Sequence, residues 1–172
     1  MVKVGINGFG RIGRLILRAL LENYKGKIQV VGINDLGSIE ANAHLIKFDS
    51  THGTLNHDVK TTKEGFQIGD QNIKVFAERD PSKLPWGKIG ADVVLECTGF
   101  FLDKKSAGKH IEAGAKKVII SAPAKEVDFT VVQGVNSKDL KKEHNVISNG
   151  SCTTNCLAPV AMVLENTFGI EY

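Results

Sequence analysis

The N-terminal segment constrains the fold of this chain more than any other part of the sequence. A short apolar run, Val2–Ile6, has the composition of a buried strand. Glycines in the pattern G-x-G-x-x-G follow at Gly8, Gly10 and Gly13. Apolar residues then recur at the spacing of one helical face, which predicts a helix. The residues of this face are Ile12, Leu15, Ile16, Ala19 and Leu20. A strand, a glycine-rich turn and a helix in this order are typical of a dinucleotide phosphate site.

Each glycine of the turn has its own purpose in such a site. Gly8 permits the tight turn, Gly10 lets the backbone approach a pyrophosphate, and Gly13 lets helix and strand pack closely. Free N–H groups at the helix start then face the negative charge. Asp35, after the next predicted strand, is placed to accept hydrogen bonds from a ribose diol. Its charge would repel the extra phosphate of NADP, so NAD is favoured; the alternative is a structural turn beside a surface aspartate.

The rest of the chain repeats the alternation of strand and helix. Repeated strand-helix-strand units predict an α/β fold with a doubly wound, mostly parallel sheet. Turn residues suggest an antiparallel hairpin insertion near residues 54–76. We expect a dinucleotide-binding domain over residues 1–150, and the start of a second, catalytic domain over 151–172. Further strands are expected at Ile28–Ile33, Ala91–Leu95, Lys117–Ser121, Phe129–Gln133 and Val146–Ser148, and helices at Ile39–Phe48, Lys104–Ala113 and from about Cys152.

A second candidate site lies at Cys152, where a predicted strand gives way to a helix. A helix N-terminus favours the thiolate, which is the nucleophilic form of cysteine. Ser151 and Thr153 can cap this helix and polarise the site, and Cys156 should lie one turn further on the same face but deeper. Ordinary caps beside two buried cysteines, or a metal site, are the alternatives. Together with the glycine turn, the cysteine suggests a dehydrogenase that captures an aldehyde on sulfur.

Charge, cysteine content and spacing narrow the possible ligands and partners. A lone C-x-x-x-C pair without ligand spacing among the histidines argues against metal. The net charge is only +3, and the densest lysine cluster, Lys138–Lys142, is interrupted, which favours solvated surface over a nucleic-acid interface. We find no membrane-spanning run and no signal-peptide layout. Three cysteines without a disulfide framework fit a reducing cytoplasm.

Several motifs resemble those of the phosphorylating, NAD-dependent glyceraldehyde-3-phosphate dehydrogenase family. They occur in the family's order along the whole chain, and the cysteine motif at their end is the family's hallmark. Leu36 resembles the NAD-preferring branch. Gly150 stands where alanine is common, which could loosen the turn before Cys152. The motifs are Val4–Gly13, Ile33–Leu36, Phe48–Gly53, Glu78–Pro81, Glu96–Phe101, Ile119–Pro123 and Ser151–Cys156.

The resemblance implies a Rossmann NAD-binding domain with a role for each matching residue. Asn7, Arg11 and Ile12 should line the pyrophosphate turn beside its three glycines, with Asp35 on the adenosine ribose. The remaining cofactor contacts are expected at Arg79, Thr98, Gly99 and Ser121, and the substrate contacts at Ser151, Cys152 and Thr153.

The resemblance also implies a glycolytic reaction. Cys152 would attack glyceraldehyde 3-phosphate, NAD would accept the hydride, and inorganic phosphate would cleave the thioester to 1,3-bisphosphoglycerate. Family members are longer homotetramers whose catalytic histidine lies beyond Tyr172, so we expect this chain to be incomplete and inactive alone. We also expect its last helix to expose an apolar face and to associate. Erythrose-4-phosphate dehydrogenase and a non-catalytic NAD-binding module are the alternatives.

Overall fold

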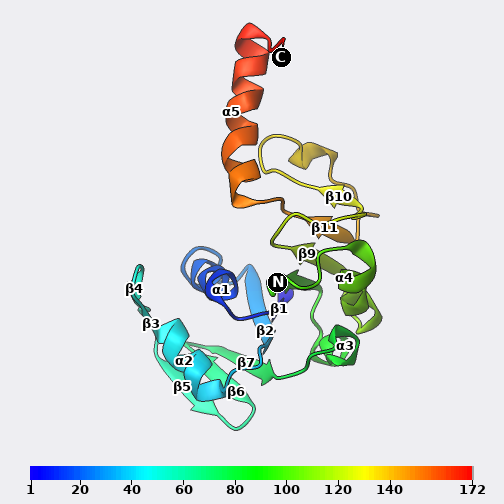
Figure 1. Cartoon of the computed structure of the whole chain (residues 1–172). Helices are drawn as coiled ribbons and strands as arrows, with labels where there is room; N and C mark the ends of the chain where they lie inside the picture. Colours follow the sequence, from blue (N-terminus) through cyan, green and yellow to red (C-terminus); the bar gives the residue numbers. More distant parts are fainter. Residues whose placement is uncertain (172) are drawn as a thin grey trace.

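A nine-stranded, mostly parallel sheet organises the chain, and the computed structural model describes it over residues 1–171 (Figure 1). Its strand order is β10-β11-β9-β8-β1-β2-β7-β6-β5. The strands are β1 (Val2–Asn7), β2 (Ile28–Asn34), β5 (Val59–Thr62), β6 (Gly65–Ile68), β7 (Gln71–Phe76), β8 (Val93–Glu96), β9 (Lys117–Ile120), β10 (Phe129–Thr130) and β11 (Val146–Ser148). The helices are α1 (Arg11–Asn23), α2 (Ile39–Lys47), α3 (Trp86–Ile89), α4 (Lys104–Glu112) and α5 (Cys152–Phe168). Two single 3-10 turns occur at Pro81–Lys83 and Ser137–Asp139.

The central strand β1 pairs in parallel with β2 on one side and with β8 on the other. The chain winds outward from β1 in both directions, which confirms the predicted doubly wound α/β fold. Register places Asn7 opposite both Asn34 and Glu96, the last residues of the two neighbouring strands. Three polar side chains therefore meet where the winding direction reverses, which is the place where such sheets bind ligands.

The predicted hairpin near residues 54–76 is confirmed as the antiparallel strands β5, β6 and β7. Strand β7 also pairs in parallel with β2, so the hairpin extends the main sheet. A separate antiparallel pair joins β3 (Phe48–Asp49) to β4 (Gly53–Thr54). The helix predicted over Ile39–Phe48 ends at Lys47, because Phe48 adopts an extended conformation and enters this pair.

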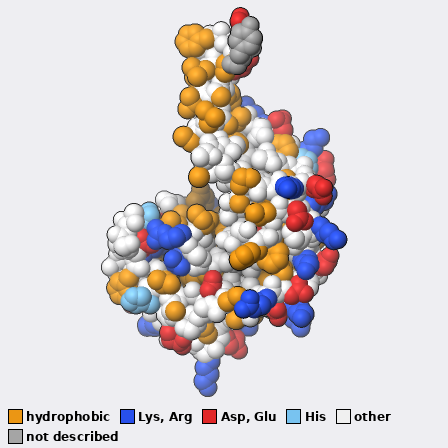
Figure 2. Space-filling model, viewed as in Figure 1, with side chains coloured by type: hydrophobic (Ala, Val, Ile, Leu, Met, Phe, Trp, Pro, Cys, Tyr) orange, Lys and Arg blue, Asp and Glu red, His pale blue; other side chains and the backbone are white. Residues whose placement is uncertain are grey.

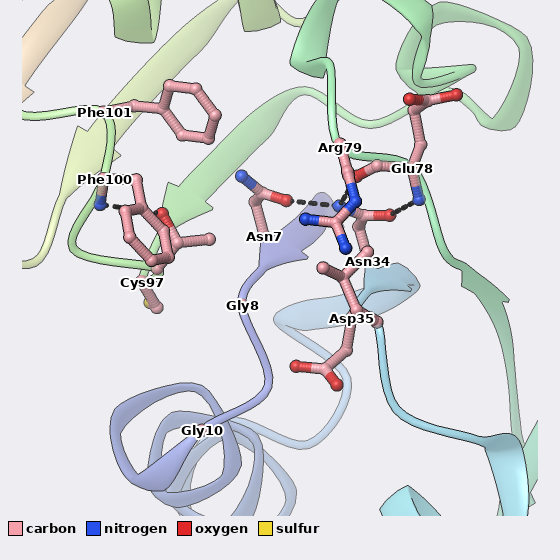
Figure 3. A pocket seen from close by; sticks show the side chains of 12 residues that line it. Asn7, Gly8, Gly10, Asn34, Asp35, Glu78, Arg79, Cys97, Phe100 and Phe101 are labelled. Atoms are coloured by element: carbon pink, nitrogen blue, oxygen red, sulfur yellow. Dashed lines mark hydrogen bonds between the residues drawn. The ribbon is translucent and has the colours of Figure 1, made fainter.

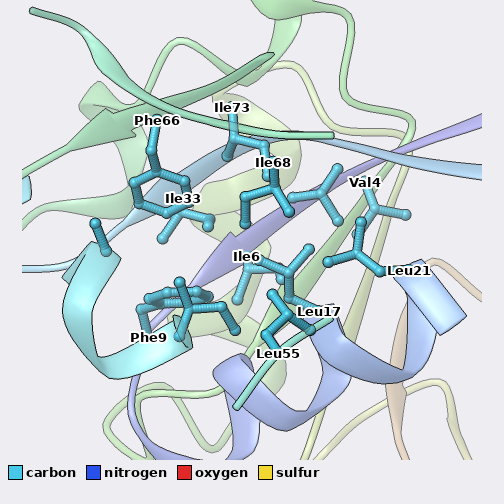
Figure 4. Close-up of a cluster of buried hydrophobic side chains, with 13 residues drawn as sticks. Val4, Ile6, Phe9, Leu17, Leu21, Ile33, Leu55, Phe66, Ile68 and Ile73 are labelled. Carbon is cyan, nitrogen blue, oxygen red and sulfur yellow. The ribbon is translucent and has the colours of Figure 1, made fainter. Parts of the chain in front are cut away.

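Helix α1 packs on the sheet through a different face from the predicted one. Ile12 is 50% exposed, whereas Gly13, Leu17 and Leu21 are buried. The two leucines belong to the cluster between α1, α2 and the sheet (Figure 4). Arg18 is also buried, and its guanidinium donates to the carbonyls of Ile46 and Lys47 at the end of α2 and of Gly53 in β4. The prediction from apolar spacing was wrong because it gave no weight to a glycine contact or to an arginine with buried acceptors.

Helix α5 projects from the carboxyl edge of the sheet and exposes its apolar side chains (Figures 1 and 2). Leu157 is 65% exposed and Phe168 is 80% exposed. The expected exposed apolar face is confirmed, but the deeper position expected for Cys156 is wrong. Its thiol is exposed because, within residues 1–171, α5 buries none of its side chains.

None of the described helices combines the length and apolar character that crossing a bilayer requires.

The contact between α1 and the turn after β1 gives a first prediction. A Cβ at Gly13 would lie 2.2 Å from the carbonyl oxygen of Gly8, so Gly13→Ala should destabilise the chain, at the upper end of the ~1–3 kcal/mol usual for overpacking. Gly108 in α4 is the control, since a Cβ there meets no atom of the described chain within 4 Å. Gly108→Ala should stabilise by about 0.5–1 kcal/mol. Urea unfolding followed by circular dichroism measures both; equal effects would contradict this packing.

The exposed face of α5 gives a second prediction. We expect the chain to associate, because a continuous apolar stripe on one helix is a surface that water disfavours. The double substitution Leu157→Glu and Val160→Glu should reduce the association. Leu140→Glu, at an exposed leucine outside α5, should leave it unchanged. Sedimentation velocity over a concentration series tests this, and a wild-type chain that stays monomeric at high concentration would refute it.

Candidate functional site

A cavity of about 510 Å³ opens over the carboxyl ends of β1, β2 and β8 (Figure 3). Six of the residues assigned to the cofactor from the sequence line it: Asn7, Gly8, Gly10, Asp35, Arg79 and Thr98. Six others had no role assigned in cofactor contact: Asn34, Leu36, Glu78, Cys97, Phe100 and Phe101. All six residues of this second group lie in the family motifs, so membership of a motif was the signal in the sequence that could have found them.

The glycine turn forms one side of this cavity. Gly8 has a φ of +91°, and a Cβ on it would lie 2.7 Å from the backbone nitrogen of Thr98. A Cβ on Gly10 would meet no atom of the described residues within 4 Å, which leaves room for a ligand against the backbone. The turn therefore combines a close approach to the backbone that follows β8 with an open cradle at the start of α1.

Helix α1 begins at this cradle without the side-chain cap that α2, α4 and α5 have. Ser38, Asp103 and Ser151 accept a backbone hydrogen bond at the starts of α2, α4 and α5. At Gly10, the residue before α1, the described residues provide no such bond, and no acidic side chain lies in the first turn. The first N–H groups of α1 are thus available to an anionic ligand, and this end of the helix fits a phosphate group.

Asp35 is held at the cavity wall by backbone donors. The N–H of Phe9 donates to its Oδ2 at 2.9 Å, and the N–H of Gly37 donates to its Oδ1 at 2.8 Å. These bonds fix the carboxylate at the end of β2, beside Gly10 in the view of Figure 3. A fixed carboxylate retains lone pairs for hydroxyl donors, so its position suits a ribose diol.

Beneath the cavity lies a buried polar network that the sequence did not reveal. Asn7 donates to Glu96 at 2.6 Å and accepts from Asn34 at 2.7 Å. His110 Nε2 lies 2.9 Å from the same carboxylate, and Trp86 Nε1 donates to His110 Nδ1 at 2.9 Å. All five residues are buried. The Asn7 side chain is thus part of the floor of the site and is directed away from the glycine turn.

The other predicted cofactor residues lie around the cavity without lining it. Arg11 forms an ion pair with Asp49, a buried residue next to the β3–β4 turn. The backbone N–H of His52, then the guanidinium of Arg11, hold the pKa of Asp49 well below its usual range. Ile12 is half exposed and Gly13 is buried against the turn. Gly99 and Ser121 follow the ends of β8 and β9, outside the lining residues.

Cys152 is the first residue of α5 and is exposed. The Ser151 hydroxyl accepts from the N–H of Thr154 at 2.9 Å, which confirms Ser151 as the helix cap. Thr153 is no cap; it lies inside the first turn, and its hydroxyl is 2.8 Å from that of Ser151. Gly150, in the turn before the helix, has a φ of +66°, which glycine adopts without strain, and its N–H donates to the Ser148 hydroxyl at 3.0 Å.

Cys97 differs from Cys152 in its surroundings. It lies between β8 and the cavity and is half-buried. Burial, opposed by a hydrogen bond with Ser121 and reinforced by the nearby charge of Glu96, raises the pKa of Cys97 to about 11. Cys97 is therefore a protonated wall residue at neutral pH.

The described residues contain no group of three or more side chains placed to hold a metal ion.

The family model and the curated relatives that match this chain point to the same family. The family described as "Glyceraldehyde 3-phosphate dehydrogenase, NAD binding domain" matches residues 2–104. Relatives named glyceraldehyde-3-phosphate dehydrogenase include one from Xanthobacter flavus, 55% identical over 170 residues, and one from Geobacillus stearothermophilus, 56% identical over 170 residues. These alignments cover 99% and 98% of this chain, but only 51% and 50% of the relatives.

The chain thus spans about half the length of the curated relatives that it matches. A third relative, glyceraldehyde-3-phosphate dehydrogenase 1 of Bacillus subtilis, is 55% identical over 171 residues and is likewise covered to 50% of its length. The matched family covers the glycine turn, Asp35 and the strands that surround the cavity. The chain belongs to the glyceraldehyde 3-phosphate dehydrogenase NAD-binding domain family.

Proposed function

We propose that this chain forms the cofactor half of an NAD-dependent, phosphorylating glyceraldehyde-3-phosphate dehydrogenase and carries its nucleophile. The observation that supports this most is that the cavity and Cys152 share one edge of the sheet. Cys152 follows β11, and β11 is separated from β1 by β9 and β8. Three strand spacings amount to roughly 14 Å, a separation that an extended dinucleotide in the crevice can bridge.

The chain's own residues would hold NAD, which supplies a hydride acceptor when bound. The N–H groups at the start of α1, including that of Ile12 in its first turn, would bind the pyrophosphate. Asp35 and Arg79 both line the cavity, where Asp35 would bind the adenosine ribose and Arg79 would lie beside the adenine. Arg11, which is paired with Asp49, would line the pyrophosphate turn. Thr98 and Gly99 would flank the cofactor, and Ser121 would lie near it.

Catalysis would begin with attack by the Cys152 sulfur on the aldehyde carbon of glyceraldehyde 3-phosphate. The new C–S bond gives a hemithioacetal, whose oxidation would leave a thioester on Cys152: the carbon would give up a hydride to the acceptor that NAD supplies, and the hydroxyl proton would pass to the family's general base. Inorganic phosphate then displaces the sulfur to give 1,3-bisphosphoglycerate. The backbone N–H of Cys152, at the start of α5, would stabilise the developing oxyanion, with Ser151 and Thr153 beside the substrate.

We further propose that residues 1–150 act as the NAD-binding domain and that 151–172 begin the catalytic domain. The family's general base has no counterpart among the five histidines of this sequence. His110, for example, is buried beneath the cavity. The complete dehydrogenase would work as a cytoplasmic homotetramer on small phosphorylated substrates, without nucleic-acid or membrane partners.

Binding and turnover should separate in this chain. Calorimetry should detect NAD binding, while the absorbance assay for phosphate-dependent NAD reduction with glyceraldehyde 3-phosphate should show no turnover. Gly10→Ala should weaken NAD binding at least about tenfold (about 1.4 kcal/mol), because its Cβ enters the cradle. Its effect on folding should be about 1 kcal/mol or less. Cys152→Ala is the control and should bind NAD normally. Absence of NAD binding to the folded wild-type chain would overturn the proposal.

The three cysteines should differ in their reaction with iodoacetamide. At pH 8 we expect Cys152 to react first, because it lies at the start of α5, and Cys97 last, because its pKa is raised to about 11. Labelling of Cys97 should increase only as the pH approaches that value, since the thiolate is the reactive form. Cys156 should be intermediate, and Cys152 should react more slowly than in a full-length relative that has the catalytic histidine. Mass spectrometry of the peptides measures the three rates, and equal rates in the folded chain would contradict the assignment.

A further inference from the structure

The buried network beneath the cavity has one carboxylate at its centre. Glu96, the last residue of β8, is 1% exposed. Its Oε2 faces the amide nitrogen of Asn7 at 2.6 Å and His110 Nε2 at 2.9 Å. Its Oε1 accepts from the N–H of Thr98 at 2.8 Å and also from the Thr98 hydroxyl. The carboxylate thus has four donors around its two oxygens, which offsets the cost of burying its charge.

The tautomer of His110 follows from its other neighbour. The indole N–H of Trp86 can only donate, and it points to His110 Nδ1 at 2.9 Å. Nδ1 must therefore accept, so the proton of the neutral imidazole lies on Nε2 and is donated to Glu96. Trp86 and His110 are both fully buried, and in this arrangement His110 holds the Glu96 carboxylate from below.

From Glu96 the network extends to one wall of the cavity. The Thr98 hydroxyl, which donates to Glu96, accepts from the N–H of Phe100 at 3.1 Å. Phe100 is 84% exposed and lines the cavity together with Phe101. The turn that presents these two rings is thus fixed through the Thr98 side chain to the buried carboxylate.

The same network reaches the opposite wall through two asparagines. Asn7 accepts from Asn34 at 2.7 Å, and Asn34 bonds both the N–H and the carbonyl of Glu78 at 2.8 Å (Figure 3). Glu78 is followed by Arg79, and both line the cavity. One chain of hydrogen bonds therefore joins the Thr98–Phe101 wall to the Glu78–Arg79 wall below the ligand space.

We propose that Glu96 and His110 are positioning residues for the cofactor: they hold the two walls of the cavity at the separation that binds a dinucleotide. This inference rests on the proposed NAD-binding function. Neither residue lines the cavity, so the inference means that two buried side chains influence the affinity for the cofactor from beneath the site. If the network served only stability, substitutions in it would change the affinity for NAD no more than an equally destabilising substitution elsewhere in the core.

The test compares four variants of the full chain. Glu96→Gln places an amide donor against donors, and His110→Leu removes both hydrogen-bonding atoms. His110→Gln keeps one donor and one acceptor and is the conservative variant. Ile68→Ala is the stability control, because Ile68 in β6 is buried in the apolar cluster between α1, α2 and the sheet. Calorimetry gives the Kd for NAD, and urea unfolding gives the stability of each variant.

We expect Glu96→Gln and His110→Leu to raise the Kd by about 10- to 100-fold, as when a supporting hydrogen bond behind a site is lost. His110→Gln should restore most of the affinity lost in His110→Leu, and Ile68→Ala should lower stability with little change in Kd. Wild-type affinity in a folded Glu96→Gln variant would overturn the proposal. So would equal Kd values for the two His110 variants, or a Kd in Ile68→Ala raised as far as in Glu96→Gln.

Amide hydrogen exchange of the nucleotide-free chain separates this inference from the proposed function. In Glu96→Gln, exchange should increase at Thr98 and Phe100 and at Glu78, while the β5–β6 hairpin stays protected. Unchanged exchange at both walls would overturn the positioning role of Glu96 even if the chain binds NAD. A wild-type chain that does not bind NAD would overturn the proposed function. The exchange result alone would then decide whether Glu96 holds the two walls in place.

Discussion

The contact between α1 and the turn after β1 determines much of this structure. Gly13 lies so close to the carbonyl of Gly8 that no side chain fits between them. The helix therefore packs closely against the sheet, and Leu17 and Leu21 are buried in the core. The same packing brings Arg18 inward to the carbonyls of Ile46, in α2, and of Gly53, in β4. It also directs the open end of α1 toward the cavity, so packing and ligand binding depend on one backbone contact.

A second constraint acts on the floor of the cavity. The parallel register brings Asn7, Asn34 and Glu96 together at the ends of three adjacent strands. Buried polar side chains need partners, and these three find them in one another, in His110 and in the walls above. The site is therefore supported by a directional hydrogen-bonded layer, which specifies geometry more closely than apolar packing alone.

Helix α5 is held differently from the rest of the domain. Its first turn is fixed by the Ser151 cap and by the Asn155 amide, which donates to the carbonyls of Asn149 at 2.7 Å and Ser151 at 2.9 Å. The remainder of the helix contributes no buried side chain within residues 1–171. The position of Cys152 thus depends on local bonds at the sheet edge, while the apolar stripe beyond it is open to solvent.

The sequence alone determined the order of strands and helices, the glycine turn, Asp35 and the cysteine at a helix start. These features depend on local spacing and on residues whose backbone requirements are visible in the sequence. Only the tertiary structure decided which face of α1 is buried, that Cys156 is exposed, and that Arg11 turns to Asp49. It alone joined Trp86, His110 and Glu96 beneath the cavity. These contacts link residues far apart in the chain, and neither periodicity nor motif spacing carries information about which distant acceptor a buried donor will meet.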